Sequence, residues 1–183
     1  MRHSPLNAAL CHRASKRRQE LEKKKVKFFV SYAHRNSELA TEFIEHLRDV
    51  LKPSKSYCYE YWQDNQLTVG EKWDNQIQEA VESCDLGLLL ISPSFLSSNY
   101  ITQNELPTFV NGKPCVPVML AKIDLERHDL KGLEARQIFR LNRDKFKSPR
   151  AYSELKKKRR EDFIFELFQA IETKLDESFK SDA

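Results

Sequence analysis

Glycine is scarce in this chain: only four of the 183 residues are glycine, at Gly70, Gly87, Gly112 and Gly132. No two of them are close enough to form a GxGxxG fingerprint or a P-loop, whose glycines let the backbone approach phosphate groups. The sequence therefore excludes a nucleotide site built on a glycine-rich phosphate cradle. A GxSxG motif is also missing, which removes the usual α/β-hydrolase architecture.

Cysteines are few and widely spaced, with no CxxC pair and no short Cys/His cluster. This spacing argues against a zinc site and a disulfide framework and indicates a reducing compartment. Cys58, Cys84 and Cys115 lie in apolar strand or helix patterns, where we expect small core residues. The histidines at the following positions have no metal-ligating neighbours at the right spacing, so we predict no metal: His34, His46 and His128.

Long apolar runs are absent as well. The longest, Leu86–Ile91, is far shorter than the roughly 18 to 20 residues that a membrane-spanning helix needs. The N-terminus has no apolar core of signal-peptide length. We therefore expect a cytoplasmic protein with no membrane partner.

Charge is unevenly distributed. Residues 1–25 contain eight Lys or Arg and two Glu, a surplus of six that leaves −2 for residues 26–183 out of the total of +4. Residues 131–160 form a second basic segment, with twelve Lys or Arg and three acids. Such segments attract anions, so nucleic acid is a possible partner of the N-terminal arm. The absence of aromatic residues in the arm argues against base stacking and favours a solvated tail.

The remainder of the chain alternates between strand and helix patterns. We expect a basic flexible arm at 1–25, one domain at 26–178 and a tail at 179–183. The predicted strands are 26–31, 57–62, 86–91, 114–120 and, more weakly, 137–141. The predicted helices are 36–51, 73–84, a short 99–106 that Pro107 breaks or kinks, and 153–179. This alternation predicts an α/β fold with a mostly parallel five-stranded sheet and helices on both faces.

The stretch 92–107, SPSFLSSNYITQNELP, follows the buried strand 86–91 and contains one carboxylate, Glu105. Open α/β sheets bind ligands just beyond the carboxyl ends of their strands. For the same reason Tyr32 and His34, after the first strand, and Ser92, after the third, are candidate pocket residues. Loop packing is the competing explanation for Tyr32 and Ser92, and a surface position is the competing explanation for His34.

Three strings occur in a fixed order: FFVSYAHRN, then YWQDNQLTVGEKWDNQIQEAVESCDLGLLLISPSFLSSNY, then ITQNELP. Together they resemble the Toll/interleukin-1 receptor (TIR) domain family, and more closely its bacterial-type members. The resemblance covers about residues 26–175. It implies a flavodoxin-like strand order, 2-1-3-4-5.

Members of that family are either adaptors, which only self-associate, or enzymes that cleave NAD⁺ at the nicotinamide glycosidic bond. The resemblance places the catalytic glutamate of the enzymes at Glu105, with NAD⁺ as substrate and no cofactor. Enzymatic members often have a tryptophan four residues earlier, where this chain has Ile101 beside Tyr100. Both residues are therefore candidates for substrate contact.

Self-assembly is implied by the same resemblance. The loop after the second strand, the BB loop of the family, corresponds here to 64–72 and includes Asp64, Leu67 and Gly70, with Trp73 just after it. In family enzymes the BB loop of one copy meets the pocket of another, so we expect an active homo-oligomer in defence or immune signalling, with a sensor or activator as further partner. A non-enzymatic adaptor, which would need the BB loop but not Glu105, is the alternative.

Overall fold

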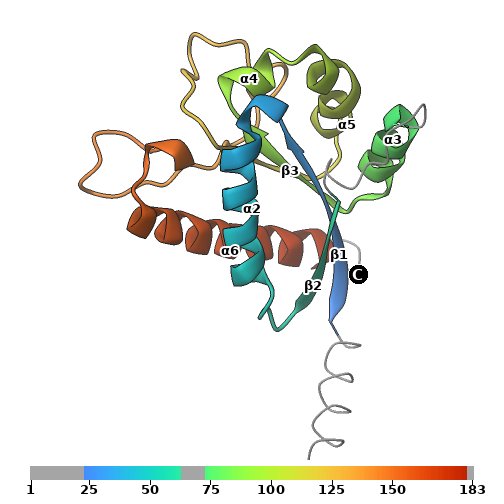
Figure 1. Cartoon of the computed structure of the whole chain (residues 1–183). Coiled ribbons are helices and arrows are strands. Elements are labelled where there is room, and N and C mark those ends of the chain that lie inside the picture. The colour runs from blue at the N-terminus through green and yellow to red at the C-terminus, as the bar shows by residue number, and fades with distance from the viewer. Residues whose placement is uncertain (1–22, 63–72, 181–183) are drawn as a thin grey trace, which may run out of the picture.

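The computed structural model describes residues 23–62 and 73–180, which form strands and helices around one sheet (Figure 1). The strands are β1 (Lys24–Tyr32), β2 (Tyr57–Trp62), β3 (Leu86–Ile91) and β4 (Cys115–Met119). The α-helices are α2 (Ser37–Leu51), α3 (Trp73–Ser83), α4 (Pro93–Leu96), α5 (Leu106–Val110) and α6 (Lys157–Lys180). Three shorter turns are η1 (His34–Asn36), the π-helical η3 (Ile101–Glu105) and η4 (Tyr152–Glu154). None of the helices within these ranges could span a bilayer.

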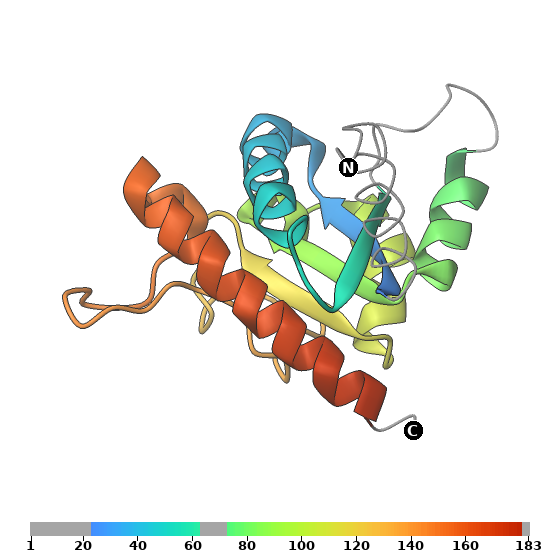
Figure 2. The same cartoon turned by 90° about the horizontal axis from the view of Figure 1, so that it is seen from below.

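The sheet is parallel throughout, and its strand order is β2-β1-β3-β4. Helices cover both faces: α2 and α6 lie on one side, and α3, α4 and α5 on the other (Figure 2). The predicted α/β class is therefore confirmed. Each face has its own apolar core, here called the α2–α6 cluster and the α3–α5 cluster.

Strand β1 shows the sequence pattern of a strand that is covered by helices on both faces. Val26, Phe28 and Val30 pack into the α2–α6 cluster, whereas Phe29 packs into the α3–α5 cluster. Successive side chains of a strand point to opposite faces, so a strand buried on both sides needs apolar residues at both parities. Ser31 is the buried polar exception, and it points to the same face as Phe29.

The predicted fifth strand at 137–141 is wrong. Of the residues 137–141, all of which the structure describes, only Phe139 pairs with β4. Its N–H donates to the Pro117 carbonyl at 2.8 Å, and its carbonyl accepts from the Met119 N–H at 3.0 Å. Leu141 instead forms an antiparallel bridge with Arg150. The segment is short and mixes apolar with polar side chains, so it pairs at one residue and then leaves the sheet.

Pro117 lies in β4, the last strand in the order of the sheet. Because its carbonyl accepts from Phe139, on the side away from β3, its nitrogen faces the same outer side. The missing N–H therefore costs no hydrogen bond to β3, which is the usual condition for proline in a strand.

The cysteines follow their predicted packing in part. Cys84 and Cys115 are buried, and burial raises the pKa of both thiols, that of Cys84 to about 11. Both are thus protonated at neutral pH and suited to packing rather than to nucleophilic chemistry. Cys58 is only half-buried, so it is not a full core residue.

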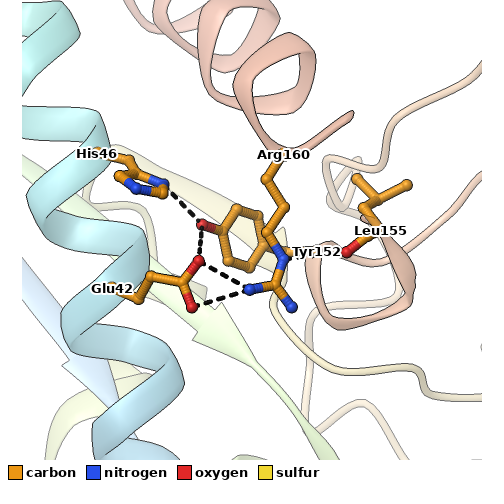
Figure 3. A network of polar contacts seen from close by, with 5 residues as sticks. All are labelled: Glu42, His46, Tyr152, Leu155 and Arg160. Carbon is orange, nitrogen blue, oxygen red and sulfur yellow. Dashed lines mark hydrogen bonds and ion pairs between the residues drawn. The ribbon is translucent and has the colours of Figure 1, made fainter. Parts of the chain in front are cut away.

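A polar network ties α2 to the segment that leads into α6 (Figure 3). Arg160 donates from Nη1 to both carboxylate oxygens of Glu42, at 2.7 and 2.8 Å, and from Nε to the Leu155 carbonyl at 3.1 Å. The Tyr152 hydroxyl donates to Glu42 at 3.3 Å and lies 3.1 Å from Nδ1 of His46. The long helix begins at Lys157 rather than near residue 153, because Tyr152–Glu154 forms the separate turn η4.

We expect this network to make stability depend on acid pH. The hydrogen bond from Arg160 holds the pKa of Glu42 below its ordinary value of 4.5. A carboxyl whose pKa is lower in the folded state stabilises the fold above its unfolded pKa, and this contribution is lost as the pH falls through the folded pKa. Because Glu42 is 40% exposed, solvent screening limits the effect to about 0.5–1 kcal/mol.

Urea unfolding at pH 7 and at pH values below 4.5 would measure this contribution. In Glu42→Gln the stability difference between the two conditions should shrink by that amount. Glu45→Gln, an exposed change on the same helix, is the matched control. An acid dependence that is identical in wild type and Glu42→Gln would contradict the assignment.

Gly87, in β3, is required by close packing rather than by backbone conformation. A Cβ atom there would lie 2.3 Å from Cε1 and 2.8 Å from Cζ of Phe109. The Phe109 ring is fully buried and stacks on Phe29 with centroids 5.9 Å apart, so it has little room to move. The absence of a side chain at Gly87 therefore lets α5 approach the sheet.

Gly87→Ala should lower the free energy of unfolding by about 1–3 kcal/mol through overpacking. Chemical denaturation of Gly87→Ala, Phe109→Leu and the double variant would test the cause. We expect the double variant to be more stable than the sum of the single changes predicts, since the smaller side chain vacates the space. Additive effects would show that the Phe109 contact is not the reason.

Candidate functional site

The strand order places the topological switch point of the sheet between β1 and β3. From β1 the chain moves to β2 on one side and then crosses to β3 on the other, so the connections diverge at this pair. In open α/β sheets ligands bind at such a switch point, outside the carboxyl ends of the strands. Here these ends are Tyr32 of β1 and Ile91 of β3.

Ser92 and Asn36 link the loops that follow β1 and β3 at this switch point. The Ser92 hydroxyl accepts from the Phe95 N–H at 3.0 Å, which caps α4, and donates to Oδ1 of Asn36 at 2.7 Å. Ser92 is fully buried. Its observed contacts are those of a helix cap and a cross-link between the loops after β1 and β3, and contact with a ligand stays a prediction.

Glu105 lies at the end of the π turn η3. The Leu106 N–H donates to the Ile101 carbonyl, one residue farther back than in an α-helix. Pro107 follows directly, and it has no N–H to continue the α-helical ladder. The wide turn accommodates the proline without ending the helix, which continues through α5, so Pro107 alters the helix rather than breaking it. Single π turns of this kind occur often at functional sites.

The Glu105 carboxylate points toward β1, where the Ser31 hydroxyl donates a hydrogen bond to its Oε2. Glu105 is 8% exposed and Ser31 2% exposed. A buried carboxylate is costly unless hydrogen bonds compensate for the lost water. The contact joins residues 74 positions apart in the chain.

Ser31 was missed by sequence reasoning, although one signal pointed to it. Apart from Lys27 it is the only polar residue in the run VKFFVS, and strand alternation places it on the face of Phe29. Only the position of η3 over that face shows what Ser31 contacts. Asn36 precedes α2 as its N-cap residue, but its side chain makes no capping bond and instead accepts from Ser92.

The remaining predicted pocket residues are not all brought together. Tyr32 packs against the α2–α6 cluster, on the opposite face of the sheet from Glu105, and His34 is exposed in η1. Tyr100 is half-buried against the α3–α5 cluster. Ile101 belongs to that cluster and is 4% exposed, so its observed role is packing. Substrate contact by any of these four stays a prediction.

The predicted assembly residues cannot be placed. Asp64, Leu67 and Gly70 lie outside the described residues, as does most of the basic N-terminal arm. Trp73 is described only as the first residue of α3.

The comparisons with known proteins settle the family. A family model described as TIR domain matches residues 28–156. The chain belongs to the TIR domain family. The match includes all four strands except the start of β1, and it contains both Ser31 and Glu105. A comparison with curated proteins found no significant match.

The TIR domain family contains NAD⁺ hydrolases as well as non-enzymatic members, and TIR domains generally self-associate. Family membership thus agrees with the fold but does not show whether this TIR domain is an enzyme. That question depends on the residues of its candidate site. Its four-stranded order β2-β1-β3-β4 agrees with the first four strands of the flavodoxin-like order.

Ser31 should act as a positioning residue for Glu105. Ser31→Ala removes the hydroxyl and leaves a buried carboxylate without this donor, which costs roughly 1–3 kcal/mol of stability. Ser31→Thr retains a hydroxyl and should be milder. Thermal and urea unfolding of both variants in wild-type and Glu105→Gln backgrounds would measure the coupling. Equal losses in the two backgrounds would show that the hydrogen bond contributes nothing.

Proposed function

We propose that this TIR domain is an NAD⁺ nucleosidase that cleaves the bond between nicotinamide and ribose. The products would be nicotinamide and ADP-ribose, or a cyclic form of the latter. The observation that carries the proposal is Glu105, a buried carboxylate that accepts a hydrogen bond from Ser31 of β1, next to the β1–β3 switch point. The presence of NAD⁺ hydrolases in the family supports it.

The chemistry requires little more than one well-placed carboxylate. As the C1′–N1 bond breaks, its electron pair goes to the pyridinium nitrogen and nicotinamide leaves as a neutral molecule. No general acid is needed for such a leaving group. Positive charge develops on the ribose, as in glycoside hydrolysis, and an anion beside the sugar stabilises it. Water then adds at C1′ and loses a proton.

Burial and positioning would make Glu105 effective in this role. A charge in a poorly solvated site interacts more strongly with a developing opposite charge than it would in water. The Ser31 hydrogen bond fixes one carboxylate oxygen, so the carboxylate needs less reorganisation during the reaction. In this scheme Glu105 is the catalytic residue and Ser31 positions it.

Self-assembly would regulate the activity. With 8% of its surface exposed, Glu105 has little direct access to a ribose in the single chain. Contact with substrate therefore requires a shift of the surrounding segments, and docking of a second copy is our proposed source of that shift. Depletion of NAD⁺, or a nucleotide signal made from it, would be the output in defence signalling.

One observation favours a second candidate, a non-enzymatic TIR adaptor. Ile101, where enzymatic members often have tryptophan, is packed in the α3–α5 cluster and offers no aromatic surface. In an adaptor, Glu105 and Ser31 would serve only to fix η3 against β1.

Nicotinamide release from NAD⁺ at high protein concentration distinguishes these functions. We expect release by the wild type and a loss of at least about a hundredfold in Glu105→Ala and Glu105→Gln, as when a group that stabilises transition-state charge is removed. Glu134→Ala, which changes an exposed glutamate, is the matched control and should keep wild-type activity.

Assembly should be measured on the same samples, by light scattering. Absence of release from wild-type protein that does assemble would favour the adaptor. Equal release by wild type and Glu105→Gln would exclude Glu105 as the catalytic residue.

A further inference from the structure

A second site is indicated by a cavity on the face covered by α2 and α6, away from Glu105. Its volume is about 440 Å³, within the range of pockets that hold small organic ligands. The wall consists of the C-terminal part of α2 and the α2–α6 face of β2. The residues on which the inference depends are Lys23, Arg48, Asp49, Lys52 and Tyr61.

The tyrosines of β2 provide the first observation. Tyr57, Tyr59 and Tyr61 alternate along the strand, so all three point to the same face. The Tyr57 hydroxyl donates to Asp176 at 2.5 Å and that of Tyr59 to Glu172 at 3.0 Å. The Tyr61 hydroxyl is buried and has no hydrogen-bond partner among residues 23–62 and 73–180. Burial raises the pKa of Tyr61, so the group is a protonated donor.

Arg48 provides the second observation. Its guanidinium carbon lies 4.7 Å from the centroid of the Tyr61 ring, and its Nε is buried without a hydrogen-bond partner in the described segments. Arg143, Arg150 and Arg160 each form an ion pair with a carboxylate, whereas no such pair is found for Arg48 in the part of the chain that the structure covers. A stacked guanidinium with an unused donor is well suited to bind a phosphate.

The surrounding charges agree with an anionic ligand. Lys52 follows Arg48 by one helical turn, and its N–H donates to the Arg48 carbonyl at 2.9 Å. Lys23 adds a third cation, and among the described lining residues Asp49 is the one carboxylate, while Asp176 and Glu172 accept from the tyrosine hydroxyls. Cations in the last turn also complement the helix dipole. That effect acts on exposed side chains equally well, and it does not explain a buried Arg48 Nε that has no hydrogen-bond partner within residues 23–62 and 73–180.

We propose that this cavity binds a small phosphorylated molecule of nucleotide size. Arg48 and the Tyr61 hydroxyl would donate hydrogen bonds to a phosphate, with Lys52 and Lys23 adding charge at the rim. The tyrosine rings provide apolar surface for a sugar or base. The site uses none of the residues around Glu105, so the proposal stands independently of the NAD⁺ nucleosidase activity.

ADP is a suitable probe, titrated into the full chain by calorimetry and followed at the Arg48 Nε–H signal by ¹⁵N NMR. We expect a Kd below about 1 mM, weakened about tenfold in Arg48→Gln and about threefold in Tyr61→Phe. Tyr61→Phe keeps the ring and hence the packing. Arg127→Gln changes an exposed arginine and should leave the affinity unchanged.

Two comparisons make the result decisive. Adenosine should not bind, and pyrophosphate should bind more weakly than ADP, because the site requires both a phosphate and an organic group. Glu105→Ala should leave the ADP-induced shift of Arg48 intact, which separates this cavity from the proposed catalytic site. No Arg48 shift with millimolar ADP, or equal affinity for wild type and Arg48→Gln, would overturn the proposal, as would equal binding of pyrophosphate and ADP.

Discussion

The parallel pairing of β1 with β3 is the constraint on which the rest of this TIR domain depends. Phe28 to Tyr32 align with Leu86 to Leu90, so two strands that are buried on both faces form the centre of the sheet. The two helical layers can then pack on opposite faces, each with its own apolar cluster. The same pairing creates the switch point, because the chain leaves these two strands in opposite directions across the sheet.

Glu105 shows how that arrangement accommodates a carboxylate within an otherwise apolar layer. The π turn before Pro107 places the side chain above β1, and Ser31 replaces part of the lost hydration. Burying this carboxylate costs folding free energy, since an apolar side chain at position 105 would pack without desolvating a charge. A functional role for Glu105 would explain why a carboxylate is present there. The buried carboxylate is thus the local feature that supports the proposed chemistry on NAD⁺.

Sequence reasoning worked best where a pattern was continuous. The bounds of β2 and β3 agreed with prediction, because β3 is an unbroken apolar run and aromatic residues alternate along β2. It failed at 137–141, where a short mixed segment pairs with β4 only through Phe139. It also grouped Tyr32 with Glu105 by nearness to strand ends, whereas alternation along β1 sends Tyr32 to the other face.

By itself, the sequence determined the α/β class and the parallel sheet and made Glu105 a candidate catalytic residue, because alternating apolar patterns and a set of family motifs are local properties of the chain. Tertiary structure alone decided that Ser31 is the partner of Glu105 and that Arg48 lies against Tyr61. These pairs come from segments whose spacing in the sequence is arbitrary. They meet only because the strand order and the packing of α2 and η3 on opposite faces bring them together.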